Sequence, residues 1–143
     1  IVINPDTGTM DALAGLARAK EMGWTKVAVT IAGFQHELAE EIREKYPDAL
    51  IIAVHTSSVA SLEDALRLAK VSDLIFSCAS KYVREAAAST ALVQGGVGVP
   101  VFATSKAGKM LIMERLIETD QPLLIKNTRL PVNDMGSIPE PLV

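Results

Sequence analysis

Short aliphatic and β-branched runs alternate along this chain with longer segments of helical periodicity, and this pattern restricts the fold more than any other feature. The runs are IVIN, KVAVTIA, ALIIAVH, DLIFSC, PVFAT and PLLIK. Strands that alternate with helices are typical of a mostly parallel α/β sheet, and near-continuous hydrophobicity is typical of strands covered on both faces. We therefore predict one doubly wound, mostly parallel sheet of five to six strands, in a Rossmann-like or flavodoxin-like order.

Five helical segments separate these strands. The first is predicted to end at Gly23, the second at Pro47, and the third to begin at Ser61, which has capping-box spacing to Asp64. The fourth is expected from about residue 80 into the nineties and the fifth from about residue 105 to 119. Residues expected on the core side of the fifth helix include Met110, Leu111 and Ile117.

The length and composition indicate one globular domain. The chain has 143 residues, 49% of them hydrophobic and 22% charged, which is close to the usual globular balance. We expect an α/β domain over residues 1 to 127. Residues 128 to 143 form a tail in which Pro131, Pro139 and Pro141 oppose regular structure, so the tail is either disordered or packed on the domain or a neighbour.

Charge and cysteine content exclude several function classes. A formal net charge of −3 lacks the basic surface that nucleic-acid binding needs, and the apolar runs are too short to span a membrane. One cysteine cannot form an internal disulfide, and no signal-peptide pattern opens the chain, so we expect a cytoplasmic protein. The chain begins with Ile1 and not with Met, which suggests that an upstream part was removed.

Polar residues follow the predicted strands. In a parallel sheet with right-handed crossovers, these residues meet at the carboxyl edge, where α/β proteins bind ligands. The expected edge residues are Asn4, Asp6, Thr7, Thr30, Gly33, His55, Thr56, Cys78, Ser80, Thr104, Ser105, Lys126 and Asn127. Asp6 and Thr7 either bind a hydroxylated ligand or cap the first helix. The glycine-rich GGVGVP stretch at 95 to 100 is interpreted as a helix-to-strand turn at the opposite edge, because it precedes a strand.

Two helix starts carry cations where the helix dipole favours acidic residues. The fourth helix has Lys81 and Arg84 in its opening turn, and the fifth has Lys106 and Lys109. Long basic side chains can also reach into water at such positions without any function. The alternative is an anion held by backbone N–H groups, by the hydroxyls of Ser80 or Ser105, and by these cations, which would reverse the electrostatic cost.

Cys78 and His55 are the candidate catalytic residues. A cysteine at a strand end, beside a helix start and a cation, is placed to act as a nucleophile, and His55 could serve as its general base or as the base for a substrate. Both residues could equally be structural, since free cysteines are usually buried. One cysteine and two histidines make a poor metal set, so we predict no metal, and the sequence leaves open whether the protein is an enzyme.

The segments VAVTIA, IIAVHTS, SCASKYVRE, PVFATSKAGK and PLLIK, in this order and spacing, resemble the methanogenesis marker protein 8 family of archaea. The most specific pieces are Cys-Ala-Ser-Lys at 78 to 81 and Ser-Lys-x-Gly-Lys at 105 to 109. Family members are longer, with an N-terminal part that carries further cysteines, and this chain resembles their C-terminal half.

The resemblance implies a cytoplasmic accessory protein of methane-producing archaea, active in the assembly, activation or modification of methyl-coenzyme M reductase. It carries over no catalytic residue. Three hypotheses about function remain: a domain that binds an anionic small molecule or cofactor, a scaffold that contacts the reductase or its maturation factors, and a thiol-dependent enzyme. The cofactor is not identified, and the oligomeric state stays open, a homo-oligomer included.

Overall fold

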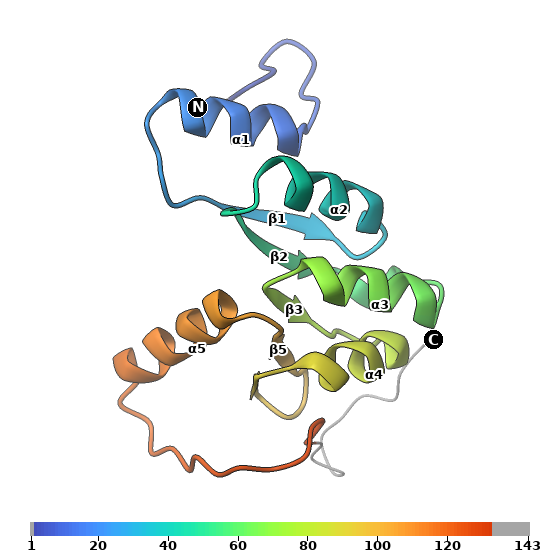
Figure 1. Cartoon of the computed structure of the whole chain (residues 1–143), viewed down its shortest axis with the longest axis vertical. Helices are drawn as coiled ribbons and strands as arrows, with labels where there is room; N and C mark the ends of the chain where they lie inside the picture. The colour runs from blue at the N-terminus through green and yellow to red at the C-terminus, as the bar shows by residue number, and fades with distance from the viewer. Residues whose placement is uncertain (1, 133–143) are drawn as a thin grey trace.

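A computed structural model describes residues 2 to 132, which form a single open sheet with helices (Figure 1). The strands are β1 (Ala28–Ala32), β2 (Leu50–Val54), β3 (Leu74–Phe76), β4 (Val93–Gly95) and β5 (Val101–Ala103). Their spatial order is β1-β2-β3-β5-β4. β1, β2 and β3 are parallel, whereas β5 runs antiparallel to both of its neighbours. The predicted open, mostly parallel α/β sheet is therefore confirmed, with β5 reversed.

The helices are α1 (Ala12–Glu21), α2 (His36–Lys45), the short 3₁₀ turn η1 (Thr56–Ser58), α3 (Leu62–Val71), α4 (Lys81–Thr90) and α5 (Lys106–Glu118). Side-chain oxygens of Ser61, Ser80 and Ser105 accept the capping N–H of α3, α4 and α5. α1 is capped by Asp11, which accepts from Ala14. The expectation that Asp6 or Thr7 caps this helix is therefore wrong, because the helix begins several residues later.

Three predicted elements differ from the structure. Residues 2 to 4 and 122 to 126 form no strand, and Ile1 and residues 133 to 143, with most of the predicted tail, lie outside the described residues. The predicted fourth helix ends at Thr90, and the chain then forms β4. Met110 and Ile117, expected on the core side of α5, are 63% and 82% exposed, because α5 covers just one end of the sheet, over β3, β5 and β4.

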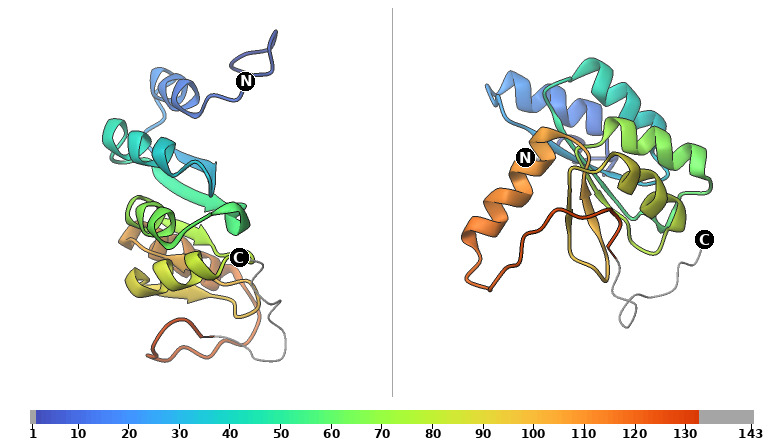
Figure 2. Two further views of the ribbon diagram at one scale, coloured as in Figure 1. Left: turned by 90° about the vertical axis from the view of Figure 1, so that its right-hand side faces the viewer. Right: turned by 60° about the horizontal axis from the view of Figure 1, so that its bottom comes forward.

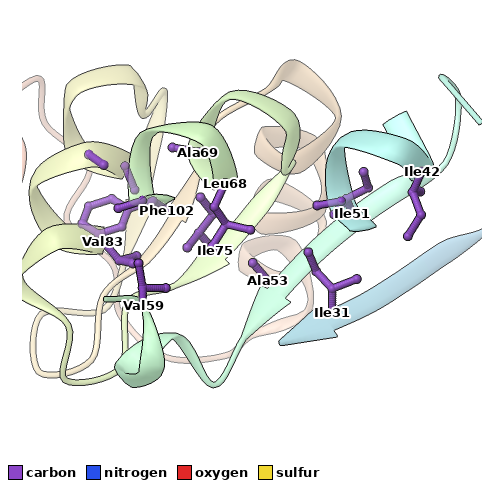
Figure 3. Close-up of a cluster of buried hydrophobic side chains, with 14 of the residues drawn as sticks. Ile31, Ile42, Ile51, Ala53, Val59, Leu68, Ala69, Ile75, Val83 and Phe102 are labelled. Atoms are coloured by element: carbon purple, nitrogen blue, oxygen red, sulfur yellow. The ribbon is translucent and has the colours of Figure 1, made fainter. Parts of the chain in front are cut away.

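One face of the sheet holds the core. α2, α3 and α4 lie side by side along this face (Figures 1 and 2). Ile31, Ile51, Ile75 and Phe102 alternate toward these helices because successive side chains of a strand point to opposite faces. Figure 3 shows them packed against helix residues and against each other; the labelled helix members are Ile42, Leu68, Ala69 and Val83.

The other face of the sheet is only partly covered. α5 covers it at the β3–β5–β4 end, where Leu74 is buried beside Gly108. Over β1, β2 and the end of β3, residues of this face are half-buried or exposed. We call this set the open face: Ala28, Thr30, Ala32, Leu50, Ile52, Val54 and Phe76.

Candidate functional site

Three loops meet at the edge formed by the carboxyl ends of β2, β3 and β4. Thr56 donates through Oγ1 to the carbonyl of Phe76 at 2.6 Å, and Ala79 N–H donates to Ser57 Oγ at 3.1 Å. The loop after β4 joins them, because Ser77 N–H donates to the Pro100 carbonyl at 2.9 Å. This edge is the candidate site.

The glycine-rich loop at 95 to 100 lies at this edge, so its predicted placement at the opposite edge is wrong. It is a hairpin turn, and not a helix-to-strand turn, because it connects β4 to the antiparallel β5. Gly96 has a φ of +75°, which glycine adopts without steric cost. The reversal of β5 brings the loop beside the residues that follow β3.

Arg84 is the most unusual residue of the site. It lies in the first turn of α4, and it is only 7% exposed. Its Nη2 donates to the carbonyl of Cys78 at 2.9 Å, while its Nε is buried without a hydrogen-bond partner in the described part of the chain. Among residues 2 to 132, no Asp or Glu pairs with it. The site therefore contains a buried positive charge that no acidic side chain of residues 2 to 132 neutralises.

The start of α4 adds further donors. The Ser80 hydroxyl, which we considered as a ligand contact, is fully buried and accepts from Val83 N–H as the helix cap. The first N–H groups of a helix have no partner within it, and α4 has no acidic residue in its first turn. Lys81 is exposed, with its Nζ 4.9 Å from the centre of the Tyr82 ring. The local field at this helix start is positive.

Ser77 precedes Cys78, whose carbonyl accepts from Arg84, and its buried hydroxyl also lacks a partner among the described residues. Sequence reasoning passed over Ser77 because a serine between an apolar strand and a helix reads as an ordinary linker. It also placed the glycine loop at the wrong edge, as a helix-to-strand turn. The Gly-Gly pair shortly before a Pro could have indicated a hairpin there.

His55 directly follows β2, and Cys78 is the second residue after the neighbouring strand β3. Both have left-handed backbone, with φ of 46° and 51°, which is uncommon for residues other than glycine. Cys78 is half-buried and His55 is exposed. Strained conformations of this kind cluster at functional sites, so the two residues stay candidates. Thr56, also predicted as a ligand contact, is fully buried and used in the bond to Phe76.

The second cationic helix start is not part of this site. Because β5 is reversed, Thr104 and Ser105 leave the sheet at the opposite edge, beside Asp73, which precedes β3. Thr104 N–H donates to the Asp73 carbonyl at 3.0 Å, and the Ser105 hydroxyl donates to the Asp73 carboxylate. The prediction that both helix starts converge on one ligand is therefore wrong. Lys106 and Lys109 are exposed at this other edge.

The anion at the start of α5 is the protein's own Asp73 carboxylate. Asp73 is 5% exposed and also accepts from Arg43 Nη2 at 2.6 Å and from Ile51 N–H at 2.8 Å. Arg43 in turn donates to the carbonyls of Val71, Pro47 and Ala49. The Asp73 carboxylate thus joins α2, β2, β3 and α5, and this arrangement is structural.

The N-terminal candidates are also separate from the site. Asp6 and Thr7 are exposed in a turn that precedes α1, where Thr7 Oγ1 bonds Thr9 Oγ1 at 2.9 Å. Within residues 2 to 132 no group of three or more His, Cys, Asp or Glu side chains is placed to hold a metal ion. The same residues contain no helix that is long and apolar enough to cross a membrane.

The fold and the edge described above define a single-sheet α/β protein with a cationic helix start at the carboxyl edge. Residues 1 to 117 match the family described as "Uncharacterized protein conserved in archaea (DUF2099)". The chain belongs to this family. It is also 31% identical over 144 residues to an uncharacterized protein of Methanocaldococcus jannaschii, a match that covers 100% of this chain and 50% of the relative. The chain therefore spans about half the length of that curated relative. No solved structure matches it.

Proposed function

We propose that this chain binds an anionic small molecule or cofactor at the start of α4, with Arg84 as the charged contact. The observation that carries the proposal is the burial of Arg84 without an acidic partner among residues 2 to 132. A buried charge without a counter-ion costs several kcal/mol, roughly 3–5 when a partner is removed. A bound phosphate, carboxylate or sulfonate would neutralise the guanidinium and could accept from both Arg84 and the free N–H groups of the helix.

The two cationic helix starts provide a matched test. Inorganic phosphate and 2-mercaptoethanesulfonate are titrated into the protein, with calorimetry and the NMR signal of the Arg84 Nε–H as readouts. Since a hydrogen bond to a charged group contributes about 1.5–3 kcal/mol, Arg84→Gln should weaken binding by roughly 10- to 100-fold. Lys106→Gln, at the other helix start, should leave the affinity unchanged within about twofold. Equal affinities for the parent and Arg84→Gln would contradict the proposal.

The biological setting is a second part of the proposal. The resemblance to methanogenesis marker protein 8 supports a role as an accessory protein to methyl-coenzyme M reductase, in its assembly, activation or modification. A methanogen strain that lacks the gene should then contain reductase of reduced activity or altered modification, restored by the parent gene and not by the Arg84→Gln form. Full restoration by the variant would separate this role from anion binding.

Thiol chemistry is the second candidate function. The left-handed backbone at both Cys78 and His55 favours it, because such conformations cost about 1–2 kcal/mol and persist where the surroundings impose them. A working thiol should react with iodoacetamide at pH 7 at least about tenfold faster than a cysteine in an unfolded peptide. The His55→Asn variant should lose this advantage. A rate equal to that of the peptide would leave Cys78 as a structural residue.

A further inference from the structure

The open face is an apolar surface that the described helices leave without a partner. α2, α3 and α4 occupy the opposite face of the sheet, and the left panel of Figure 2 shows no helix on the other side of β1 and β2. α5 covers only the far end of this side: a Cβ built at Gly95 would lie 3.9 Å from Cδ1 of Ile112. Half of the sheet therefore has a single covered face.

The strand register makes the open face continuous with the surface that α5 buries. Thr30 pairs with Ile52, Ile52 pairs with Leu74, and Leu74 pairs with Ala103. Burial rises along this row, from exposed Thr30 through half-buried Ile52 to Leu74 and Ala103, which are buried. One row of side chains is thus covered by α5 at one end and exposed to solvent at the other.

The chemistry of the open face suits a packed layer and not a polar ligand. None of its seven residues is charged, and Thr30 is its one polar member. Phe76 exposes 37% of its surface although it belongs to a central strand. Parallel strands with helical crossovers are found almost only in sheets whose two faces are both covered.

The comparison with the longer relative indicates where such a layer comes from. The relative has about as many residues outside the match as within it, since this chain covers 50% of its length. Among the helices of residues 2 to 132, α1 packs into the core through Leu16, α2, α3 and α4 lie on the opposite face, and α5 covers only the far end, so β1 and β2 stay bare on this side. We propose that the open face is an interface whose partner is the polypeptide that longer family members carry beyond the half matched by this chain.

The test uses the full-length Methanocaldococcus relative. A specific protease site is inserted between the matched half and the remainder, and the folded protein is then cleaved. The two pieces should stay together in size-exclusion chromatography with light scattering at micromolar concentration. A lysine at the position matched to Ile52, or at that matched to exposed Thr30, should weaken their association at least tenfold. A lysine at the position matched to Leu66, 47% exposed on α3, should have no effect.

For the cleaved protein, two outcomes would overturn the proposal: separation of the pieces without any substitution, or association that neither open-face lysine weakens. If the lysine at the position matched to Ile52 prevents folding, the lysine at the position matched to Thr30 provides the test. Thr30 is exposed in this chain, so a charge there leaves the core intact. The chain itself is examined alone in parallel. A dimer of this chain that Thr30→Lys dissociates would identify a second copy as the partner, and so would also refute the proposal.

Discussion

Gly108, in the first turn of α5, lies directly against the backbone of Asp73. A Cβ at position 108 would overlap the Asp73 carbonyl oxygen and would lie 2.7 Å from its carbon. Both neighbours are backbone atoms that cannot move aside. The contact therefore lets α5 begin in the position where Ser105 reaches the Asp73 carboxylate.

The Gly108→Ala variant should be destabilised by about 1–3 kcal/mol, as in other overpacked sites, because the methyl group forces α5 away from the sheet. Gly15→Ala in α1 is the matched control, since nothing lies within 4 Å of a Cβ there. The unfolding free energy of the control should rise by about 0.5–1 kcal/mol, because alanine has a better helix propensity than glycine. Urea unfolding measures the stability of both variants. If Gly108→Ala is as stable as the parent, the contact between Gly108 and the Asp73 backbone does not determine the position of α5.

Asp73→Ala should cost about 3 kcal/mol of unfolding free energy or more, because it leaves Arg43 without its acid and Ile51 N–H without its acceptor. Glu41→Ala is the comparison. It breaks an equally short ion pair with Lys45, at 2.6 Å, but both partners are largely exposed. A change within about 0.5 kcal/mol is expected for it. Similar losses in the two variants would show that the Asp73 carboxylate does not join the elements around it.

The ion pair between Glu40 of α2 and Arg67 of α3 should make stability depend on pH. The Arg67 hydrogen bond lowers the pKa of Glu40 below its usual 4.5. Because the folded-state pKa is below the unfolded one, the stabilisation is complete above about pH 4.5 and disappears as the pH falls through the lowered value. Glu40→Gln should thus cost roughly 0.2–1 kcal/mol of unfolding free energy at pH 7 and progressively less as the pH falls below about 4.5.

Chemical unfolding of Glu40→Gln at several pH values provides the measurement. Glu44→Gln, at an exposed position of the same helix, is the control and should show no such dependence. A loss in Glu40→Gln that stays constant down to pH 3 would rule out an electrostatic origin.

Arg84→Met should leave the anion-free protein as stable as the parent or up to about 1–4 kcal/mol more stable, because an uncompensated buried charge is replaced by an apolar chain of similar length. Phosphate should raise the melting temperature of the parent and not that of the variant. Strong destabilisation without phosphate would instead assign Arg84 a structural role through its bond to the Cys78 carbonyl.

Local signals in the sequence predicted most of the secondary structure. Ser61, Ser80 and Ser105 were expected at helix starts and cap α3, α4 and α5, because a serine hydroxyl satisfies the free N–H groups of the first turn wherever the helix lies. β4 was missed because Val93–Gly95 is short and follows an alanine-rich helix without a break. The PLLIK segment has strand composition, but in the described chain it pairs with no neighbour.

The most consequential wrong prediction was that β5 runs parallel to its neighbours. An alternation of strands and helices predicts parallel pairing, and the three-residue β5 carries no local mark of its direction. The prediction that Lys106 lies close to Arg84 required a parallel β5, which would end at the same edge of the sheet as β3. The sequence alone could predict that both helix starts carry cations. It could not predict that Arg84 is buried or that the start of α5 lies beside the Asp73 carboxylate, because both depend on contacts across the sheet.

The reversed strand makes the two ends of β5 chemically independent. The Pro100 carbonyl accepts from the Ser77 N–H at one end, and the Thr104 N–H donates to the Asp73 carbonyl at the other. The extended chain between Pro100 and Thr104 spans about 13 Å. Substitutions at Arg84 and at Asp73 share no partner, so their effects on unfolding should sum. Evolution, or an engineer, can therefore alter the chemistry at one edge of this sheet without disturbing the anchoring of α5 at the other.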